Sequence, residues 1–147
     1  MRLQKILAPT DLSPLSVPAV RYALQTALEQ RATVIVYHVV TQDSDWFGKD
    51  DPRNPAAALL PREQRRLREY MQENFRELEG KVNIAEVVEA GVPYSSIVAK
   101  ADEEAAELIV MSTHGRTGVG EMIMGSVTAK VVARARCPVL TMKPMAS

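Results

Sequence analysis

Short apolar runs alternate with helix patterns along the whole chain of 147 residues, and this alternation constrains its fold more than any other feature. Five runs predict strands over 3–8, 33–40, 82–89, 107–111 and 138–142. Several are rich in valine and isoleucine without strict polar alternation, which is typical of strands covered on both faces. A repeated strand-helix order predicts right-handed crossovers and a parallel sheet. We therefore expect an α/β fold, a five-stranded parallel sheet sandwiched by four helices in a doubly wound, Rossmann-like arrangement.

Helix patterns with one apolar stripe each fill the connections between these runs. The first follows Ser13-Pro14, which predicts an N-cap and then a proline in the first turn. The others are expected over about 61–79, closed by Gly80, over about 93–104, and from Ser126 as an N-cap. The side chains expected to face inward are Val17, Val20, Leu24, Ala27, Leu28, Leu67, Met71, Phe75, Leu78, Ile97, Val98, Ala101, Val127, Val131 and Val132.

Charge and the length of the apolar runs restrict partners and location. Lysine plus arginine and aspartate plus glutamate balance at 18 each, so no net field draws the chain to nucleic acid or an anionic membrane. The first apolar run reaches Pro9 and Asp11 too early for a signal peptide, and no later run is long enough to span a bilayer. We expect one cytoplasmic domain over residues 1–147, with neither nucleic acid nor membrane as a partner.

Histidine and cysteine are too few for a zinc-type metal centre. His38 and His114 are the two histidines, and the single cysteine, Cys137, excludes an internal disulfide. His38 lies in an apolar run and is expected to be a hydrogen-bonded core residue rather than a ligand. Cys137 precedes the last apolar run, so we expect it to pack as a small hydrophobic residue rather than to act as a nucleophile.

One connection does not fit the alternation. Residues 41–60 combine four aspartates and two prolines with Trp46 and Phe47, and they show no clear period. A connection of this length in a compact domain is usually a functional loop or a disordered insert. We expect a flexible insert that acts as a flap near the functional site.

Three predicted strands end in residues suited to a binding site. They are Pro9-Thr10-Asp11 after the first run, His38-Val39 at the end of the second, and the segment from Met111 onward after the fourth. In an open parallel sheet, ligands bind outside the carboxyl ends of the strands, where the strand order reverses. These three segments are therefore expected to converge on one crevice.

The segment 111–128 contains four of the seven glycines of the chain. Gly115 would let the loop fold back without a β-carbon in the way. Gly125-Ser126 would present amide groups and a hydroxyl at the N-terminus of the last helix, where the helix dipole favours anions. This arrangement suits a triphosphate.

Two common phosphate motifs do not fit this segment. Gly115 and Gly120 have P-loop spacing, but Glu121-Met122 stands where a lysine and a serine or threonine are required. Gly118 and Gly120 begin a dinucleotide fingerprint, but Ile123 holds the position of its third glycine.

The remaining spacing resembles the universal stress protein family, and specifically its ATP-binding branch. The family pattern is glycine, two residues, glycine, nine residues, and glycine followed by serine or threonine. Gly115 and Gly125-Ser126 fit the second and third glycines, and Ser112 occupies the position of the first. Residues 6–11 and 137–140 also resemble the family. The resemblance covers nearly the whole chain and implies the adenine nucleotide alpha hydrolase-like form of the fold.

The resemblance implies an ATP site that these segments build together. Asp11 would lie near the ribose or near a Mg²⁺ or Mn²⁺ ion held by the phosphates. The residues implied to border the adenine are Pro9, Thr10 and Val39. Those implied to wrap the ribose and phosphates are Met111, Ser112, His114, Gly115 and Arg116, and those implied to hold the phosphate tail are Gly125, Ser126, Val127 and Thr128.

Two of these residues also have simpler interpretations. Asp11 can accept hydrogen bonds from backbone amides at the start of the first helix, a capping role that is compatible with ligand contact. Arg116 is either a solvated loop charge or a bidentate phosphate contact.

The functional prediction is a nucleotide-dependent stress-response regulator or sensor with an unidentified protein partner. No nucleophile or positioned general base is evident, so no catalytic residue is assigned and at most slow ATP hydrolysis is expected. The run 138–142 is expected at the sheet edge, where the resemblance implies antiparallel pairing into a homodimer.

Two alternatives stay open. One is a dimeric interaction module of the same fold that binds no nucleotide, which Ser112 suggests. The other is a phosphoacceptor receiver-like domain, whose chemistry needs clustered acids and a lysine at successive strand ends. Here Asp11 stands alone and Lys143 is poorly placed.

Overall fold

The computed structural model describes residues 2–42, 51–114 and 124–144. In these residues one parallel sheet contains β1 (Lys5–Pro9), β2 (Thr33–Thr41), β3 (Asn83–Gly91), β4 (Leu108–Ser112) and β5 (Val139–Met142). The strand order is β3-β2-β1-β4-β5. The helices between them are α1 (Val17–Gln30), α2 (Leu60–Phe75), α3 (Pro93–Glu103) and α4 (Ser126–Arg134). The predicted five-stranded parallel sheet with four helices is confirmed.

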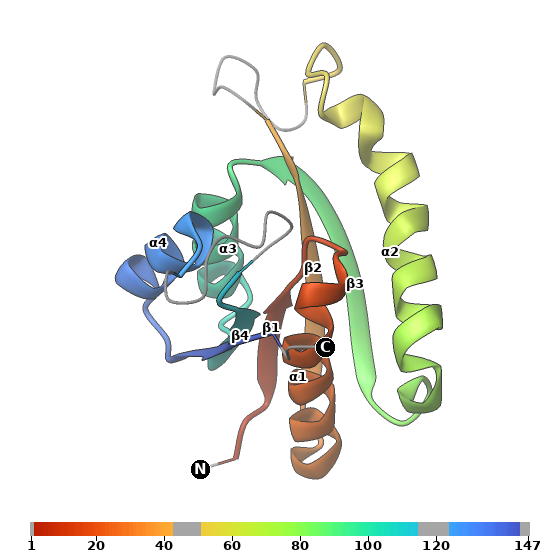
Figure 1. Ribbon diagram of the computed structural model, residues 1–147, viewed down its shortest axis with the longest axis vertical. Coiled ribbons are helices and arrows are strands. Elements are labelled where there is room, and N and C mark those ends of the chain that lie inside the picture. Colours follow the sequence, from red (N-terminus) through yellow and green to blue (C-terminus); the bar gives the residue numbers. More distant parts are fainter. Residues whose placement is uncertain (1, 43–50, 115–123, 145–147) are drawn as a thin grey trace.

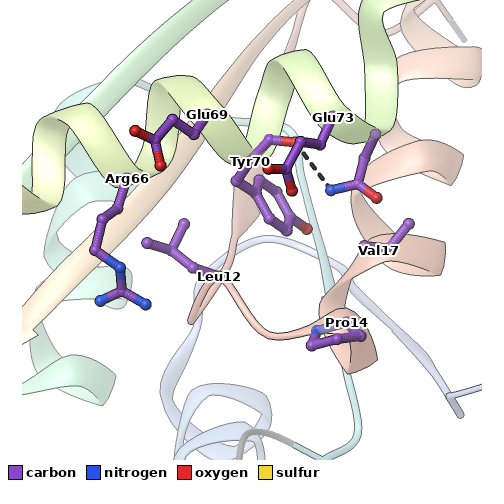
Figure 2. Close-up of a pocket in the computed structure, with 8 residues that line it drawn as sticks. Leu12, Pro14, Val17, Arg66, Glu69, Tyr70 and Glu73 are labelled. Atoms are coloured by element: carbon purple, nitrogen blue, oxygen red, sulfur yellow. Dashed lines mark hydrogen bonds between the residues drawn. The ribbon is translucent and has the colours of Figure 1, made fainter.

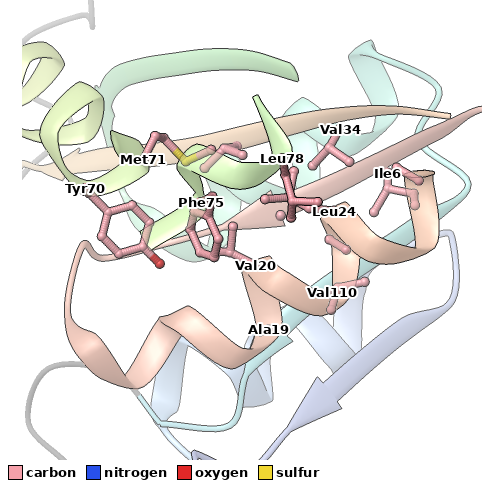
Figure 3. Packing of buried hydrophobic residues seen from close by; sticks show 14 of the residues in the cluster. Ile6, Ala19, Val20, Leu24, Val34, Tyr70, Met71, Phe75, Leu78 and Val110 are labelled. Carbon is pink, nitrogen blue, oxygen red and sulfur yellow. The ribbon is translucent and has the colours of Figure 1, made fainter. Parts of the chain in front are cut away.

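Helices cover both faces of the sheet (Figure 1). α1 and α2 pack on one face, and α3 and α4 pack together on the other. Successive strand residues point to opposite faces, so Ile6 and Ala8 face α1 and α2, whereas Leu7 faces α3 and α4. Figure 3 shows the core beneath α1 and α2. Because the central strands are buried on both faces, they need continuous apolar runs.

The strand order reverses beside β1. The chain passes from β1 to β2 and β3 on one side, while β4 and β5 lie on the other. The connection after β1 enters α1 on one face of the sheet, and the connection after β4 enters α4 on the opposite face. α1 and α4 therefore begin on opposite faces of the sheet at the carboxyl ends of β1 and β4, and a crevice is expected at this edge.

Two expected helix caps differ in detail. Ser13 takes the N-cap position of a short 3-10 turn, Pro14–Ser16, that precedes α1, but its side chain makes no capping hydrogen bond. Gly125 takes the N-cap position of α4, and Ser126 is the first helical residue. The expectation that Ser126 caps this helix was wrong because helical hydrogen bonding already starts at the Gly125 carbonyl, which accepts from Ala129 N–H at 2.9 Å.

The apolar stripes of α1 and α4 are narrower than expected. Leu28 and Val132 are 42% and 46% exposed. Each directly follows an inward residue, Ala27 or Val131, and so lies about 100° further round the helix. The expectation that Gly80 closes the second helix was wrong in position, because α2 ends at Phe75 and its 3-10 extension ends at Leu78. Gly80 instead adopts φ +82° in the following turn, where Lys81 N–H donates to Leu78 O at 3.1 Å. Among the described helices, none combines the length and the apolarity needed to cross a membrane.

The connection expected over 41–60 is shorter and partly packed. β2 continues to Thr41, and the side chain of Asn54 donates to Gln42 Oε1 at 2.8 Å. Asn54 and Ala56 are buried, and Ala56 packs against the ends of β2 and β3. Residues 43–50, with Trp46 and Phe47, lie outside the described residues, so the flap remains a prediction for that part of the chain.

Candidate functional site

A cavity of about 450 Å³ lies at the carboxyl ends of β1, β2 and β4, where the strand order reverses. Every site residue that the sequence predicted within the described ranges lines it: Pro9, Thr10, Asp11, Val39, Met111, Ser112, His114, Gly125, Ser126, Val127 and Thr128. Gly115 and Arg116 lie outside the described residues. The three segments therefore converge as expected, and their roles toward a ligand remain predictions.

Thr10 shapes the turn that follows β1. Its N–H donates to the carbonyl oxygen of Tyr37 at 2.9 Å and extends the pairing of β1 with β2 by one residue. Its hydroxyl oxygen accepts the N–H of Leu12 at 2.9 Å and lies 2.7 Å from the hydroxyl of Ser16. Thr10 is buried, so these contacts make it an organiser of the turn.

Asp11 stands at the cavity edge of this turn. Its Oδ1 accepts the backbone N–H of Ser13 at 2.9 Å and the Ser13 hydroxyl at 2.6 Å. The expected bond from Asp11 to a backbone amide before the first helix is confirmed, but Ser13 and Ser16, rather than Asp11, hold the N-cap positions of the 3-10 turn and of α1. The Asp11 carboxylate also lines the cavity. Among the described lining residues Asp11 is the one acid, and the described part of the chain holds no cluster of three or more metal-binding side chains. A cation here would need most of its ligands from elsewhere.

Beyond the turn that follows β1, the edge of β2 that faces β1 is no longer paired with it. Tyr37 receives the last hydrogen bond from this side, from Thr10 N–H. Strand backbone groups alternate in direction, so the N–H and carbonyl of Val39 point to the same side as those of Tyr37. Among the described residues, no backbone group on this side forms a hydrogen bond with them. One donor and one acceptor are therefore presented side by side to the cavity.

The N-terminus of α4 forms the opposite wall. Gly125 N–H donates to Thr113 O at 2.7 Å, and the first residues of the helix line the cavity. The N–H groups of Ser126, Val127 and Thr128 precede the first helical hydrogen bond, and the described residues offer them no acceptor. A helix start with open amides is suited to an anion.

A side chain at position 125 would crowd this wall. An added Cβ on Gly125 would lie 3.2 Å from the carbonyl oxygen of Thr113, closer than ordinary van der Waals contact. Glycine at this position therefore allows the α4 N-terminus to approach β4 closely.

Ser112 fits the position that the family pattern gives to glycine. Its backbone is outside the positive-φ region, so glycine is not required there. Its hydroxyl donates to His114 O at 2.7 Å and lies 3.3 Å from His114 N, which closes a tight turn. Its carbonyl oxygen accepts the Thr128 hydroxyl at 2.8 Å and ties β4 to α4.

His114 lines the cavity and is held by a contact with the preceding residue. Its Nδ1 lies 2.9 Å from the hydroxyl of Thr113. The described residues provide no hydrogen-bond partner for its buried Nε2.

His38 is a buried, hydrogen-bonded histidine, as expected, and it also lines the cavity. Its Nδ1 donates to the carbonyl oxygen of Thr10 at 3.0 Å, and its Nε2 lies 3.2 Å from Glu63 Oε2 on α2. Glu63 also accepts from Arg66 at 2.8 Å. Burial alone would raise the pKa of the Glu63 carboxyl, but Arg66 and His38 outweigh it and hold that pKa below its usual value.

Five further residues line the cavity that the sequence reasoning did not include: Ser16, Tyr37, Thr41, Pro93 and Ile97. Pro93 and Ile97 come from the start of α3, just after β3. The rule that sites lie at strand ends applied to β3 as well, so it could have found them.

Tyr37 anchors this side of the cavity. Its hydroxyl donates to Glu89 Oε1 at 2.7 Å, and Lys100 lies 3.3 Å from the same carboxylate. Burial, followed by the neighbouring Glu89, raises the pKa of Tyr37, so its hydroxyl stays protonated. These contacts fix the ring beneath the cavity.

Comparisons with known proteins agree with this geometry. The universal stress protein family model matches residues 2–143. Universal stress protein MJ0531 of Methanocaldococcus jannaschii is 35% identical over 145 residues, covering 95% of this chain and 82% of the relative. Universal stress protein UspA from Lactobacillus plantarum has a TM-score of 0.79 at 24% identity, covering 97% and 99% of the two chains.

A second solved structure contains a nucleotide. It is a universal stress protein in complex with cAMP, with a TM-score of 0.70 and 26% identity, covering 99% of this chain and 100% of the other. The family match over almost the full length, the identity to MJ0531 and the shared fold lead to one conclusion: the chain belongs to the universal stress protein family.

Proposed function

We propose that this protein is a cytoplasmic, single-domain regulator or sensor of the stress response that binds ATP with a divalent ion in the strand-end cavity. One observation carries the proposal. The open amides of Ser126, Val127 and Thr128 face the same cavity as the open backbone edge at Val39. One wall is suited to phosphates and the other to a base.

The base would lie against β2. Adenine presents an amino donor and a ring-nitrogen acceptor on one edge, and the N–H and carbonyl of Val39 complement that pair. The walls at this end are largely apolar, with Pro9, Ile97 and Met111 beside Val39. Such a pocket accepts a planar ring and orients it through a few polar groups.

The phosphates would lie at the N-terminus of α4. Backbone amides and the helix dipole favour negative charge there. Asp11 is placed to reach a Mg²⁺ or Mn²⁺ ion carried by the phosphates, because Mg²⁺ commonly binds through one or two carboxylates together with substrate phosphates. The ion would neutralise phosphate charge when bound. The single acid among the described lining residues fits that mode of binding.

The relative crystallised with cAMP supports an adenine nucleotide as the ligand class. Turnover is not part of the proposal. Within the described lining residues, the carboxylate of Asp11 is tied to Ser13 by two hydrogen bonds rather than poised against a nucleophile. Binding without efficient hydrolysis suits a sensor.

Calorimetric titration of the nucleotide-free protein with ATP and Mg²⁺ tests the proposal. Saturable heat is expected with the wild-type chain. Gly125→Val is expected to weaken binding by about tenfold, because overpacking against Thr113 costs about 1–3 kcal/mol. Ala133→Val adds bulk at an exposed position of α4 outside the cavity and is the matched control.

No heat with the wild-type chain would refute ATP binding. Full affinity in a folded Gly125→Val variant would place the site elsewhere. Mass spectrometry of the protein as purified adds an independent test, since a tightly held nucleotide would be detected with it.

We further propose that a second copy pairs antiparallel with β5, which lies at the edge of the sheet. Pro138 and Met142 direct their carbonyl oxygens toward β4, so by alternation the N–H of Thr141 points outward. Thr141→Pro would remove this donor without breaking the pairing of β5 with β4. Light scattering is expected to show a dimer for the wild-type chain and a monomer for the variant; a monomeric wild type would refute the pairing.

A further inference from the structure

The turn after β1 contains a strained residue. Leu12 has φ +68°, a left-handed conformation that costs a non-glycine residue energy. Strain of this kind persists only where the surroundings hold the backbone in place, and it concentrates at functional sites. The contacts that hold this turn are therefore informative about the cavity that Asp11 lines.

A buried chain of hydroxyl groups connects the turn to α2. The hydroxyl oxygens of Thr10 and Ser16 lie 2.7 Å apart, and that of Ser16 lies 2.7 Å from the hydroxyl of Tyr70. All three residues are buried. Tyr70 thus reaches the turn from a helix that contributes no residue to the lining of the strand-end cavity.

A second connection runs from the same residue to the same helix. The carbonyl oxygen of Thr10 accepts from His38, and His38 contacts Glu63 of α2. Both side chains of this pair are largely buried. The main chain and the side chain of Thr10 are therefore held from α2 by two separate routes.

Side-chain packing also holds this turn, because Leu12 and Val17 pack against the core cluster that contains Tyr70. A second cavity, of about 280 Å³, is lined by Leu12, Pro14 and Val17 together with Arg66, Tyr70 and the carboxylates of α2 (Figure 2). The hydrogen bonds that reach the turn through Ser16 and His38 therefore add to the restraint that this packing provides.

We infer that Tyr70 and Glu63 are positioning residues for the nucleotide. Acting through Ser16 and His38, they keep the turn in its strained form so that Asp11 faces the cavity. This inference rests on the proposed ATP binding, since it assigns these residues a part in the affinity of that site.

Titration calorimetry with ATP and Mg²⁺ tests the effect on affinity. Tyr70→Phe and Glu63→Gln are each expected to raise Kd by about three- to tenfold, the equivalent of one net hydrogen bond. Tyr70→Phe keeps the edge-to-face packing on Phe75, and the Ser16 hydroxyl retains its contacts with Thr10 and Ser13, so the fold is expected to survive. Tyr22→Phe and Glu29→Gln make the same chemical changes at exposed sites of α1 and are expected to leave Kd unchanged.

A rescue variant separates positioning from a general structural role. Asparagine adopts positive φ more readily than leucine. Leu12→Asn is therefore expected to restore most of the affinity lost in Tyr70→Phe, although it removes an apolar side chain. If Tyr70 served only to stabilise the fold, the double variant would bind ATP more weakly than Tyr70→Phe alone.

Amide hydrogen exchange measured without nucleotide provides an independent readout. The N–H groups of Leu12 and Ser13 are bonded within the turn, so their exchange is expected to accelerate in Tyr70→Phe. Unchanged exchange together with unchanged Kd would overturn the inference. Accelerated exchange in a protein whose wild-type form gives no heat with ATP would refute the proposed function and leave the restraint of the turn by α2 supported.

Discussion

Replacing Ser112 by glycine would restore the residue of the family pattern, and the structure predicts a loss rather than a gain. The hydroxyl of Ser112 donates to His114 O at 2.7 Å, and one net hydrogen bond is worth about 0.5–1.5 kcal/mol. Glycine also loses about 0.5–1 kcal/mol relative to alanine at the end of a strand. Ser112→Gly is therefore expected to lower the free energy of unfolding by about 1–2.5 kcal/mol.

Urea unfolding followed by circular dichroism measures this change, and thermal unfolding is expected to shift by about 2–4 °C per kcal/mol for a chain near this size. Ser112→Ala removes the hydroxyl but keeps the β-carbon, so the difference between the two variants isolates the backbone contribution of glycine. ATP affinity is not expected to improve, because Ser112 already has negative φ. Equal or higher stability of Ser112→Gly, or tighter ATP binding, would refute the reasoning.

Three other predictions follow from burial and charge. The pKa of Glu63 lies below its usual value of 4.5 in the folded chain, so its contacts with Arg66 and His38 stabilise the fold above that pH. This stabilisation is lost as the pH falls through the folded pKa. Glu63→Gln should therefore make the free energy of unfolding, measured with urea, less dependent on pH in the acid range. Burial raises the pKa of the Cys137 thiol, so its alkylation at pH 8 should be slower than that of free cysteine and should accelerate with rising pH; rapid modification of the folded chain would contradict this. Phe75→Ala should cost about 3–5 kcal/mol of unfolding free energy, since the ring is fully buried, and a cost below about 1 kcal/mol would show that the core collapses around the gap.

Features that depend on neighbouring residues in the chain were predictable from the sequence. Strand runs and helix stripes reflect the period of the backbone, and the structure contains each predicted element with small shifts of its ends. The predictions of buried helix residues failed where the direction of a side chain around the helix axis decided its burial. Leu28 and Val132 are apolar, but each lies just outside a buried stripe, and the sequence does not show how wide the covering surface is.

The candidate site also has a part that the sequence predicted and a part that it did not. Strand-end reasoning placed Asp11, Val39 and the start of α4 around one cavity because parallel strands end at the same edge. It gave no indication of the hydroxyl chain that joins Thr10 to Tyr70, since these residues are far apart in the chain and meet only when α2 packs on the sheet.

The sequence by itself determined the order of strands and helices, the segments that form the cavity and the resemblance to a family, because periodicity and motif spacing are local properties. Tertiary structure alone decided which backbone N–H and carbonyl groups are left without a hydrogen bond in the described residues. The edge of β2 at Val39 is exposed because β1 ends earlier, and the amides of α4 face the cavity because Gly125 lets the helix approach β4. It also decided that Ser112 fits without strain, since only the folded turn shows its backbone conformation and the contact of its hydroxyl with His114.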